Sequence, residues 1–200
     1  FAIDLPRLGF GGTMSITGVE ASGTETEATN TGTEDSDETS SIANTAILGS
    51  WYAELSFGDV SFGSAGNGVT FGYQSTPGDA DVSAQEVSRR DFITENTTAG
   101  AAKESTYRAQ ATISDYENMY VEIPIYSALY VKFGQSSIDV TSKERNTTTG
   151  QTSDASGTYG NTSVDGTNVG VGLKGITASN IVWKLAYEET DFDTINLTST

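Results

Sequence analysis

The clearest hydrophobic pattern in this chain lies between Met119 and Phe133, where apolar and polar residues alternate on both sides of a short break. Alternation with a period of two predicts β-strands, and the break at residues 124–127 predicts the turn of a hairpin. A register with Ile123 opposite Leu129 would place Met119 opposite Phe133. One face of this hairpin is therefore apolar, and the other carries charged and tyrosine side chains.

The same alternation recurs along most of the chain. It predicts seven strands, over residues 8–17, 45–57, 60–74, 107–123, 128–140, 167–177 and 181–188. In two strands the apolar parity switches, once within 60–74, near several glycines, and once at Asp115-Tyr116. Each switch predicts a β-bulge, because one extra residue moves the following side chains to the opposite face.

Long polar segments and short turns follow one another in strict order. The long segments are residues 22–44, 75–106, 142–163 and 191–200, and the short turns are 58–59, 124–127 and 177–180. In an up-and-down meander, this order places all long loops at one end and all tight turns at the other. That asymmetry, together with strands of about ten residues or more, is typical of transmembrane β-barrels of the outer membrane. A soluble β-sandwich stays open as the alternative fold.

Composition narrows the functions available to a single domain of 200 residues. The chain has 27 acidic and 10 basic residues, a formal net charge of −17, and neither cysteine nor histidine. Nucleic acid is therefore not an expected partner, and thiolate or imidazole chemistry is excluded. No apolar run reaches the roughly 20 residues that a transmembrane helix needs. The start at Phe1, without a leader, suits an exported mature product or a trimmed fragment.

In a barrel, the two faces of the strands acquire different environments. The predicted lumen face carries a charge network of opposite signs, with Tyr52, Tyr120 and Tyr130 beside it. Its charged members are Glu54, Glu122, Lys132, Lys174, Lys184 and Glu188. The predicted lipid-facing residues are Met119, Val121, Ile123, Leu129, Val131, Phe133, Trp183 and Leu185. The charged set has three interpretations: a structural salt-bridge interior, an ion path or binding site, or the wet face of a soluble sheet.

Other candidate sites are weaker. The acidic residues 34–38 and the pair Asp191 and Asp193 offer oxygen ligands for calcium, but their spacing does not match a calcium-binding loop. No pair of acidic residues has a spacing that indicates general acid–base catalysis. We therefore predict no metal, no cofactor and no enzymatic activity.

Several segments resemble a known family. The segments SGTYGNTSVDGTNVGVGLKG, from Ser156, and KLAYEETDFDTINLTST, from Lys184, are similar to parts of small outer-membrane β-barrel proteins of marine alphaproteobacteria. The pieces YVEIP and LYVKFG resemble further parts of the same proteins. The resemblance covers roughly residues 107–200. It implies an eight-stranded barrel of the OmpA/OmpW-like type, with no catalytic residues to carry over. The eighth strand is then expected after Thr200.

Taken together, these patterns predict a non-catalytic structural barrel in a bacterial outer membrane, in contact with lipid or lipopolysaccharide. Its long acidic loops would face the medium, where phage, neighbouring cells or neighbouring copies could contact them. One alternative is a narrow pore for small solutes. The other is a soluble extracellular β-protein, such as an adhesin, a fibre subunit or a coat subunit.

Overall fold

The computed structural model describes residues 6–25, 38–57, 68–82, 87–93, 103–146 and 161–196. These residues form one antiparallel sheet and no helix. The strands are β1 (Arg7–Glu25), β2 (Glu38–Phe57), β3 (Val69–Asp81), β4 (Val87–Ile93), β5 (Lys103–Tyr126), β6 (Leu129–Asn146), β7 (Thr162–Ile176) and β8 (Val182–Phe192). Along the sheet, the order is β1-β2-β3-β5-β6-β7-β8, and β4 pairs with β5 beside this path. The predicted all-β antiparallel meander is confirmed.

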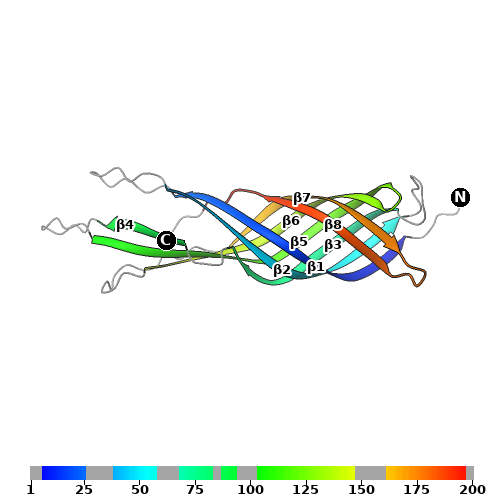
Figure 1. Cartoon of the computed structure of the whole chain (residues 1–200), viewed down its shortest axis with the longest axis horizontal. Helices are drawn as coiled ribbons and strands as arrows, with labels where there is room; N and C mark the ends of the chain where they lie inside the picture. Colours follow the sequence, from blue (N-terminus) through cyan, green and yellow to red (C-terminus); the bar gives the residue numbers. More distant parts are fainter. Residues whose placement is uncertain are drawn as a thin grey trace.

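The seven-stranded path curls into a half-barrel (Figure 1). The curl is tight enough for Lys184 on β8 to contact Glu54 on β2 across the concave side. The turns β5–β6 and β7–β8 lie at one end, whereas β4 and the first part of β5 project beyond the other end (Figure 1). Within the described residues, no helix is both long and apolar enough to span a membrane.

The strands reach further into the polar segments than the sequence predicted. β1 and β2 extend into the predicted loop 22–44, and β6 and β7 extend into 142–163. The predicted loop 75–106 contains the end of β3, all of β4 and the start of β5. Strand pairing supplies backbone hydrogen bonds whatever the side chains are, so a polar sequence continues as strand where a neighbour is available.

One further predicted boundary changes, because β8 runs to Phe192 and so includes the first residues of the predicted loop 191–200. β3 begins at Val69 among the described residues, and the predicted start of that strand at residue 60 lies outside them. The predicted turn 58–59 and the predicted bulge near the glycines lie in residues 58–67, outside the described part of the chain. The short turn near 177–180 is present between β7 and β8.

The hairpin between β5 and β6 is correctly predicted, but its register is not. Val121 pairs with Phe133 and Ile123 with Val131, which is two residues away from the predicted register. The ladder reaches Tyr126 opposite Leu129, and Ser127, with φ of 50°, lies in the turn that follows Tyr126. A slip of two residues keeps every side chain on its predicted face. The assignment of side chains to the two faces is therefore correct although the predicted register is wrong.

The bulge predicted at Asp115 is present. Between Ser114 and Glu117 the register with β6 shifts by one residue, and Asp115 has a φ of 52°. An aspartate tolerates this left-handed conformation better than most residues. A second irregularity, in β3 between Thr76 and Asp79, contains Gly78 with a φ of 107°. It falls inside the segment that the sequence predicted to be a loop.

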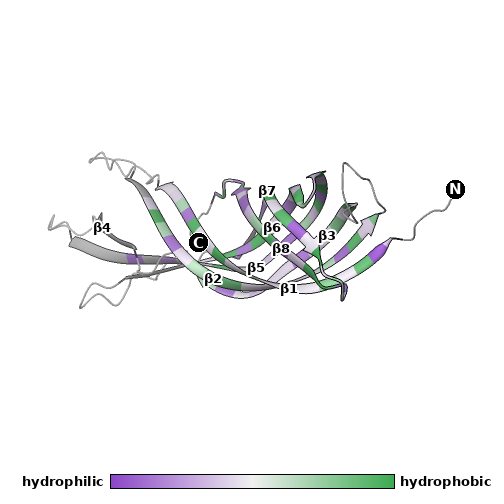
Figure 2. Ribbon diagram, turned by 45° about the vertical axis from the view of Figure 1, so that its right-hand side comes forward, coloured by the Kyte–Doolittle hydropathy of each residue, from purple (hydrophilic) through white to green (hydrophobic). Residues whose placement is uncertain are grey.

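Convex and concave faces differ sharply in composition (Figure 2). On the central hairpin, Met119, Ile123 and Phe133 are exposed on the convex side, and Val121, Leu129 and Val131 are half-buried there. Glu122, Tyr130 and Lys132, on the concave side, are at most 3 % exposed. Trp183 and Leu185 are exposed on β8. This sheet therefore exposes its apolar face and buries its charged one.

Three tyrosines on the concave face lie on glycines of the neighbouring strand. Tyr52 is opposite Gly11, Tyr120 opposite Gly72 and Tyr130 opposite Gly172. A Cβ atom added at any of the three glycines would come within 2.6 Å of the tyrosine ring. The missing side chain is what lets each ring lie down against the sheet.

We expect Gly72→Ala to destabilise the fold by about 1–3 kcal/mol, because its new Cβ would lie 2.3 Å from Cζ of Tyr120. Gly49→Ala is the matched control, since no atom lies within 4 Å of its added Cβ. Urea unfolding followed by tryptophan fluorescence measures both changes. Equal effects of the two substitutions would contradict the packing described for Tyr120.

Candidate functional site

The densest chemistry of the described chain lies on the concave face, where six charged side chains from five strands converge. Glu54 comes from β2, Glu122 from β5, Lys132 from β6, Lys174 from β7, and Lys184 and Glu188 from β8. We call these six residues the concave charge network. All of them were predicted from the alternation of the strands. Three carboxylates and three ammonium groups give it a formal charge of zero.

Four members form a continuous chain of ion pairs. Lys184 Nζ donates to Glu122 Oε1 at 2.6 Å and also to Glu54 Oε1. The other oxygen of Glu122, Oε2, accepts from Lys174 Nζ at 3.0 Å. Lys174 Nζ further contacts Thr70 Oγ1 at 3.1 Å. Glu122 is 2 % exposed. Its two carboxylate oxygens therefore contact lysine nitrogens in the place of solvent.

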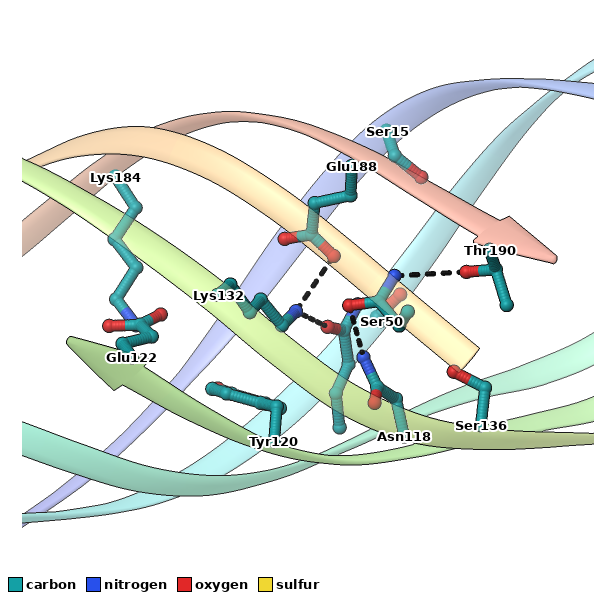
Figure 3. A network of polar contacts seen from close by, with 12 residues as sticks. Ser15, Ser50, Asn118, Tyr120, Glu122, Lys132, Ser136, Lys184, Glu188 and Thr190 are labelled. Atoms are coloured by element: carbon teal, nitrogen blue, oxygen red, sulfur yellow. Dashed lines mark hydrogen bonds and ion pairs between the residues drawn. The ribbon is translucent and has the colours of Figure 1, made fainter. Parts of the chain in front are cut away.

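The remaining two members form a separate pair. Lys132 Nζ lies 2.7 Å from Glu188 Oε2 and 3.2 Å from Gln74 Oε1 (Figure 3). It also lies 4.0 Å above the ring centre of Tyr120, within the range of a cation–π interaction. Lys132 is buried, whereas the side chain of Glu188 is 31 % exposed. Each charge of the network thus has an opposite charge in contact.

The three tyrosines join the network from the side. The hydroxyl of Tyr120 donates to Glu54 Oε1 at 2.6 Å. Lys174 lies 5.4 Å from the ring centre of Tyr130, and Lys184 lies 5.2 Å from that of Tyr52. The rings therefore fill the space between the paired charges and supply both a hydrogen bond and π faces.

Above the charges, toward the projecting end, lies a layer of uncharged polar side chains. Asn118 Nδ2 donates to Asn168 Oδ1 at 3.1 Å, and Asn168 Nδ2 donates to Thr190 Oγ1 at 2.9 Å (Figure 3). Asn118 Oδ1 is buried without a partner, directed at Gly134, where a Cβ would come within 2.3 Å. The sequence analysis did not single out these asparagines, although their parity matches that of Glu122 and Lys174.

Beyond that layer, the concave side becomes apolar. Ile138, Val140 and Val164 are buried together, with Ile113, Tyr116, Phe192 and Ile195 packed against them. The concave side thus changes along its length from charged, to neutral polar, to apolar. Each charge of the network contacts an oppositely charged side chain within these layers.

The weak candidates for calcium ligands lie only partly within the described residues. Asp191 is exposed on β8, opposite Thr167, and Asp193 follows the end of that strand. Of the acidic run 34–38, only Glu38 lies within the described residues, at the start of β2. In the part of the chain that the structure describes, no group of three acidic side chains is arranged to hold a metal ion.

Chemically, the concave charge network can compensate charge and fix side chains in place. Its six groups neutralise one another, so a bound ion or substrate would have to displace a lysine or a carboxylate from an existing pair. The salt-bridge interpretation therefore accounts for the geometry of these residues.

Comparisons with protein-family models, with curated proteins and with solved structures found no match to this chain.

We expect Glu122→Gln to destabilise the protein by about 3–5 kcal/mol, because it leaves Lys174 and Lys184 buried with one carboxylate fewer. The control is Glu117→Gln, which changes the same charge at an exposed carboxylate whose oxygen accepts from Tyr73 at 2.7 Å. We expect its effect to stay within about 1 kcal/mol. Urea midpoints of the two variants compare them directly, and a larger effect at Glu117 would count against the network.

Proposed function

We propose that this chain is a structural, non-catalytic β-barrel of a bacterial outer membrane, with its convex face in lipid. The observation that carries the proposal is the inversion of the two faces. Large apolar side chains on the convex face are widely exposed, for example Met14 at 83 %, Ile16 at 79 % and Leu185 at 70 %. Such an extended apolar surface is unfavourable in water and suits hydrocarbon.

The apolar surface of the convex face ends, toward the projecting end, along a slanted line, as expected for strands that are tilted relative to a flat membrane surface. Toward the projecting end, the last large apolar residues of the convex face are Tyr187 on β8, Val169 on β7, Phe133 on β6, Met119 on β5, Tyr73 on β3, Ile47 on β2 and Ile16 on β1. We follow this edge from β8 to β1, counting a row as two residues along a strand. Over the six steps from strand to strand, the edge moves about five rows toward the projecting end.

One row is about 6.6 Å along a strand, and one step between neighbouring strands is about 4.8 Å. For the apolar edge to lie in one flat plane, the strands must therefore tilt by roughly 50° from the barrel axis. Transmembrane strands tilt by roughly 35–45°. The slanted edge is thus close to what a planar bilayer surface would impose on tilted strands. A soluble sheet has no reason to stagger its apolar residues in this way.

Closure is the second element of the proposal. Six antiparallel steps leave β1 and β8 running in the same direction, so the two edges cannot pair as one more antiparallel ladder. One further strand between them would satisfy both edges and give the even strand number of bacterial barrels. We propose that such a strand completes the barrel, as the family resemblance implies.

The proposal is tested by the only two tryptophans of the chain, Trp51 and Trp183, which lie on the convex face and are 48 % and 49 % exposed. After reconstitution in vesicles, lipids with brominated acyl chains should quench the fluorescence of both, because bromine quenches on contact. Fluorescence in brominated and ordinary vesicles is the measurement.

A control places the fluorophore on the other face. With Trp51 and Trp183 both replaced by phenylalanine, Tyr116→Trp puts a single tryptophan in the apolar cluster of the concave side. Brominated lipid should leave this variant unquenched. A chain that stays folded without amphiphile and shows no quenching of Trp51 or Trp183 would instead be the soluble β-protein.

Within the membrane class, we propose a closed barrel rather than a narrow pore. The charge network, the asparagine layer and the apolar cluster occupy successive levels of the concave side. In planar bilayers, we expect no single-channel steps where an added porin, as positive control, gives them. Regular steps from the wild-type chain would favour the small-solute pore.

A further inference from the structure

A shallow groove crosses the convex face over three neighbouring strands, β6, β7 and β8 (Figure 1). Two valines of the middle strand form its floor, and the larger Phe133 and Tyr187 form its sides. The convex residues that line it are Val131, Phe133, Val169, Val171, Tyr187 and Glu189. Lys132 also borders the groove, but its Nζ is bound to Glu188 on the concave side.

The size of the groove limits what it can hold. Its volume is about 250 Å³, below the roughly 300–1,000 Å³ of pockets that enclose a small molecule. It is an open trough rather than an enclosed cavity, and its lining is apolar except for Glu189. These properties suit a single hydrocarbon chain that lies along the strands.

The groove lies at the edge of the apolar surface. Phe133, Val169 and Tyr187 are the last large apolar residues of their strands toward the projecting end. Glu189 lies one row beyond Tyr187 on β8, about 6.6 Å along the strand, and Asp191 lies two rows beyond it. The headgroup layer of a bilayer is roughly 5–8 Å deep on each side. This step rests on the proposed function, since it takes the apolar edge as the lipid boundary. An occupant of the groove then has its headgroup beside these carboxylates.

Beyond this edge, the rim of the groove is acidic. We call Glu189, Asp191 and Asp165, which are all exposed, the rim carboxylates. Asp191 is opposite Thr167, so Asp165 is diagonal to it, at about 7–8 Å. Asp193 follows beside Asp165 and donates its backbone N–H to the Asp165 carbonyl. On β6 through residue 141, on β7 and on β8, the convex side chains beyond this edge include no cation. Like charges on one face of a sheet repel one another, so a cation held at this rim is favourable.

We propose that this groove holds an acyl chain of a phospholipid whose headgroup is ethanolamine. The primary ammonium of ethanolamine is a compact positive charge with three N–H donors, which the rim carboxylates accept. The phosphate of the same headgroup accepts from the hydroxyl of Thr167 and the amide of Gln135, which lie in one row with Asp191. The apolar floor and the acidic rim therefore select the same class of molecule.

Other occupants match the groove less well. Phosphatidylglycerol is anionic and is repelled by the rim carboxylates. The choline headgroup carries its positive charge without an N–H donor. A second copy of the chain, related by a twofold axis, would bring the same patch of both copies together. The rim carboxylates of the two copies would then face each other, and such juxtaposed like charges oppose association.

The test uses the full chain in phosphatidylcholine vesicles that contain a minor fraction of a lipid with brominated acyl chains. In a background of Trp51→Phe and Trp183→Phe, Tyr187→Trp puts the only tryptophan beside the groove. Ile16→Trp in the same background is the matched control, because residue 16 lies at the same apolar edge on β1 and is 79 % exposed. Brominated phosphatidylethanolamine should quench the Tyr187→Trp variant about threefold more than the control variant. Brominated phosphatidylcholine should quench both equally.

A second comparison tests the rim carboxylates. Adding Glu189→Gln and Asp191→Asn to the Tyr187→Trp variant should remove the excess quenching by phosphatidylethanolamine. Adding Glu20→Gln and Asp79→Asn is the control, because it removes the same charge from exposed positions on β1 and β3. This control should keep the excess.

A third measurement leaves the groove unchanged. Trp183 lies on the same face of β8 as Tyr187, four residues away, whereas Trp51 lies on β2. With Trp51→Phe and Trp183→Phe made singly, brominated phosphatidylethanolamine should quench Trp183 more than Trp51, relative to brominated phosphatidylcholine. This reading does not depend on the folding of a variant at residue 187.

Several outcomes would overturn the inference. It fails if brominated phosphatidylcholine gives the same excess beside the groove, or if brominated phosphatidylglycerol does so with calcium or with EDTA. It fails if the two pairs of acidic substitutions act equally. It also fails if every lipid quenches the Tyr187→Trp variant less than the control, since another copy then covers the groove. Quenching of the Ile16→Trp control without a preference for ethanolamine defeats this inference alone, whereas no quenching at any position defeats the proposed membrane location.

Discussion

The structure depends on filling the concave side of a strongly curved sheet. A sheet that curls this tightly leaves little volume on its inner side, and every polar group placed there must find its partner among the other strands. Glu122 meets this constraint most directly, since each of its oxygens accepts from a different lysine, one on β7 and one on β8. Lys184 then joins it to Glu54 on β2. These contacts tie strands that are not neighbours in the sheet, so they hold its curvature as well as its charges.

Much of this arrangement can be predicted from the sequence, because the period of two assigns every strand residue to a face. All six charged residues fall on one side by parity alone, and the error of two residues in the hairpin register left that assignment intact. The pairing partners within the network could not be predicted. They depend on how far the sheet curls, and alternation carries no information about curvature.

The ends of the strands were harder to predict from the sequence than their faces. The segment around β4 has no apolar alternation, yet Val87–Ile93 pairs with the outer part of β5, because a long neighbouring strand offers its free hydrogen-bonding groups. The asparagine layer was missed because an asparagine among many threonines and asparagines has no distinctive sequence pattern. Its parity with Glu122 and Lys174 was the available signal. The proposed lipid contact follows from the same assignment of strand residues to two faces, applied to the apolar face.

The tyrosine–glycine contacts bear on how the chain finds its pairing. The ladders β1–β2, β3–β5 and β6–β7 join strands that are well separated in the sequence. The separating residues are 26–37, 82–102 (which include β4) and 147–161, and these separations are too long for a tight turn to set the register. Each of these three ladders holds one of the three tyrosines against a glycine. If β5 slipped by two residues along β3, Tyr120 would face Thr70 or Gln74 instead of Gly72, and its ring would meet a side chain. The contact between tyrosine and glycine thus disfavours a misaligned pairing sterically in ladders whose connection is too long to fix the register.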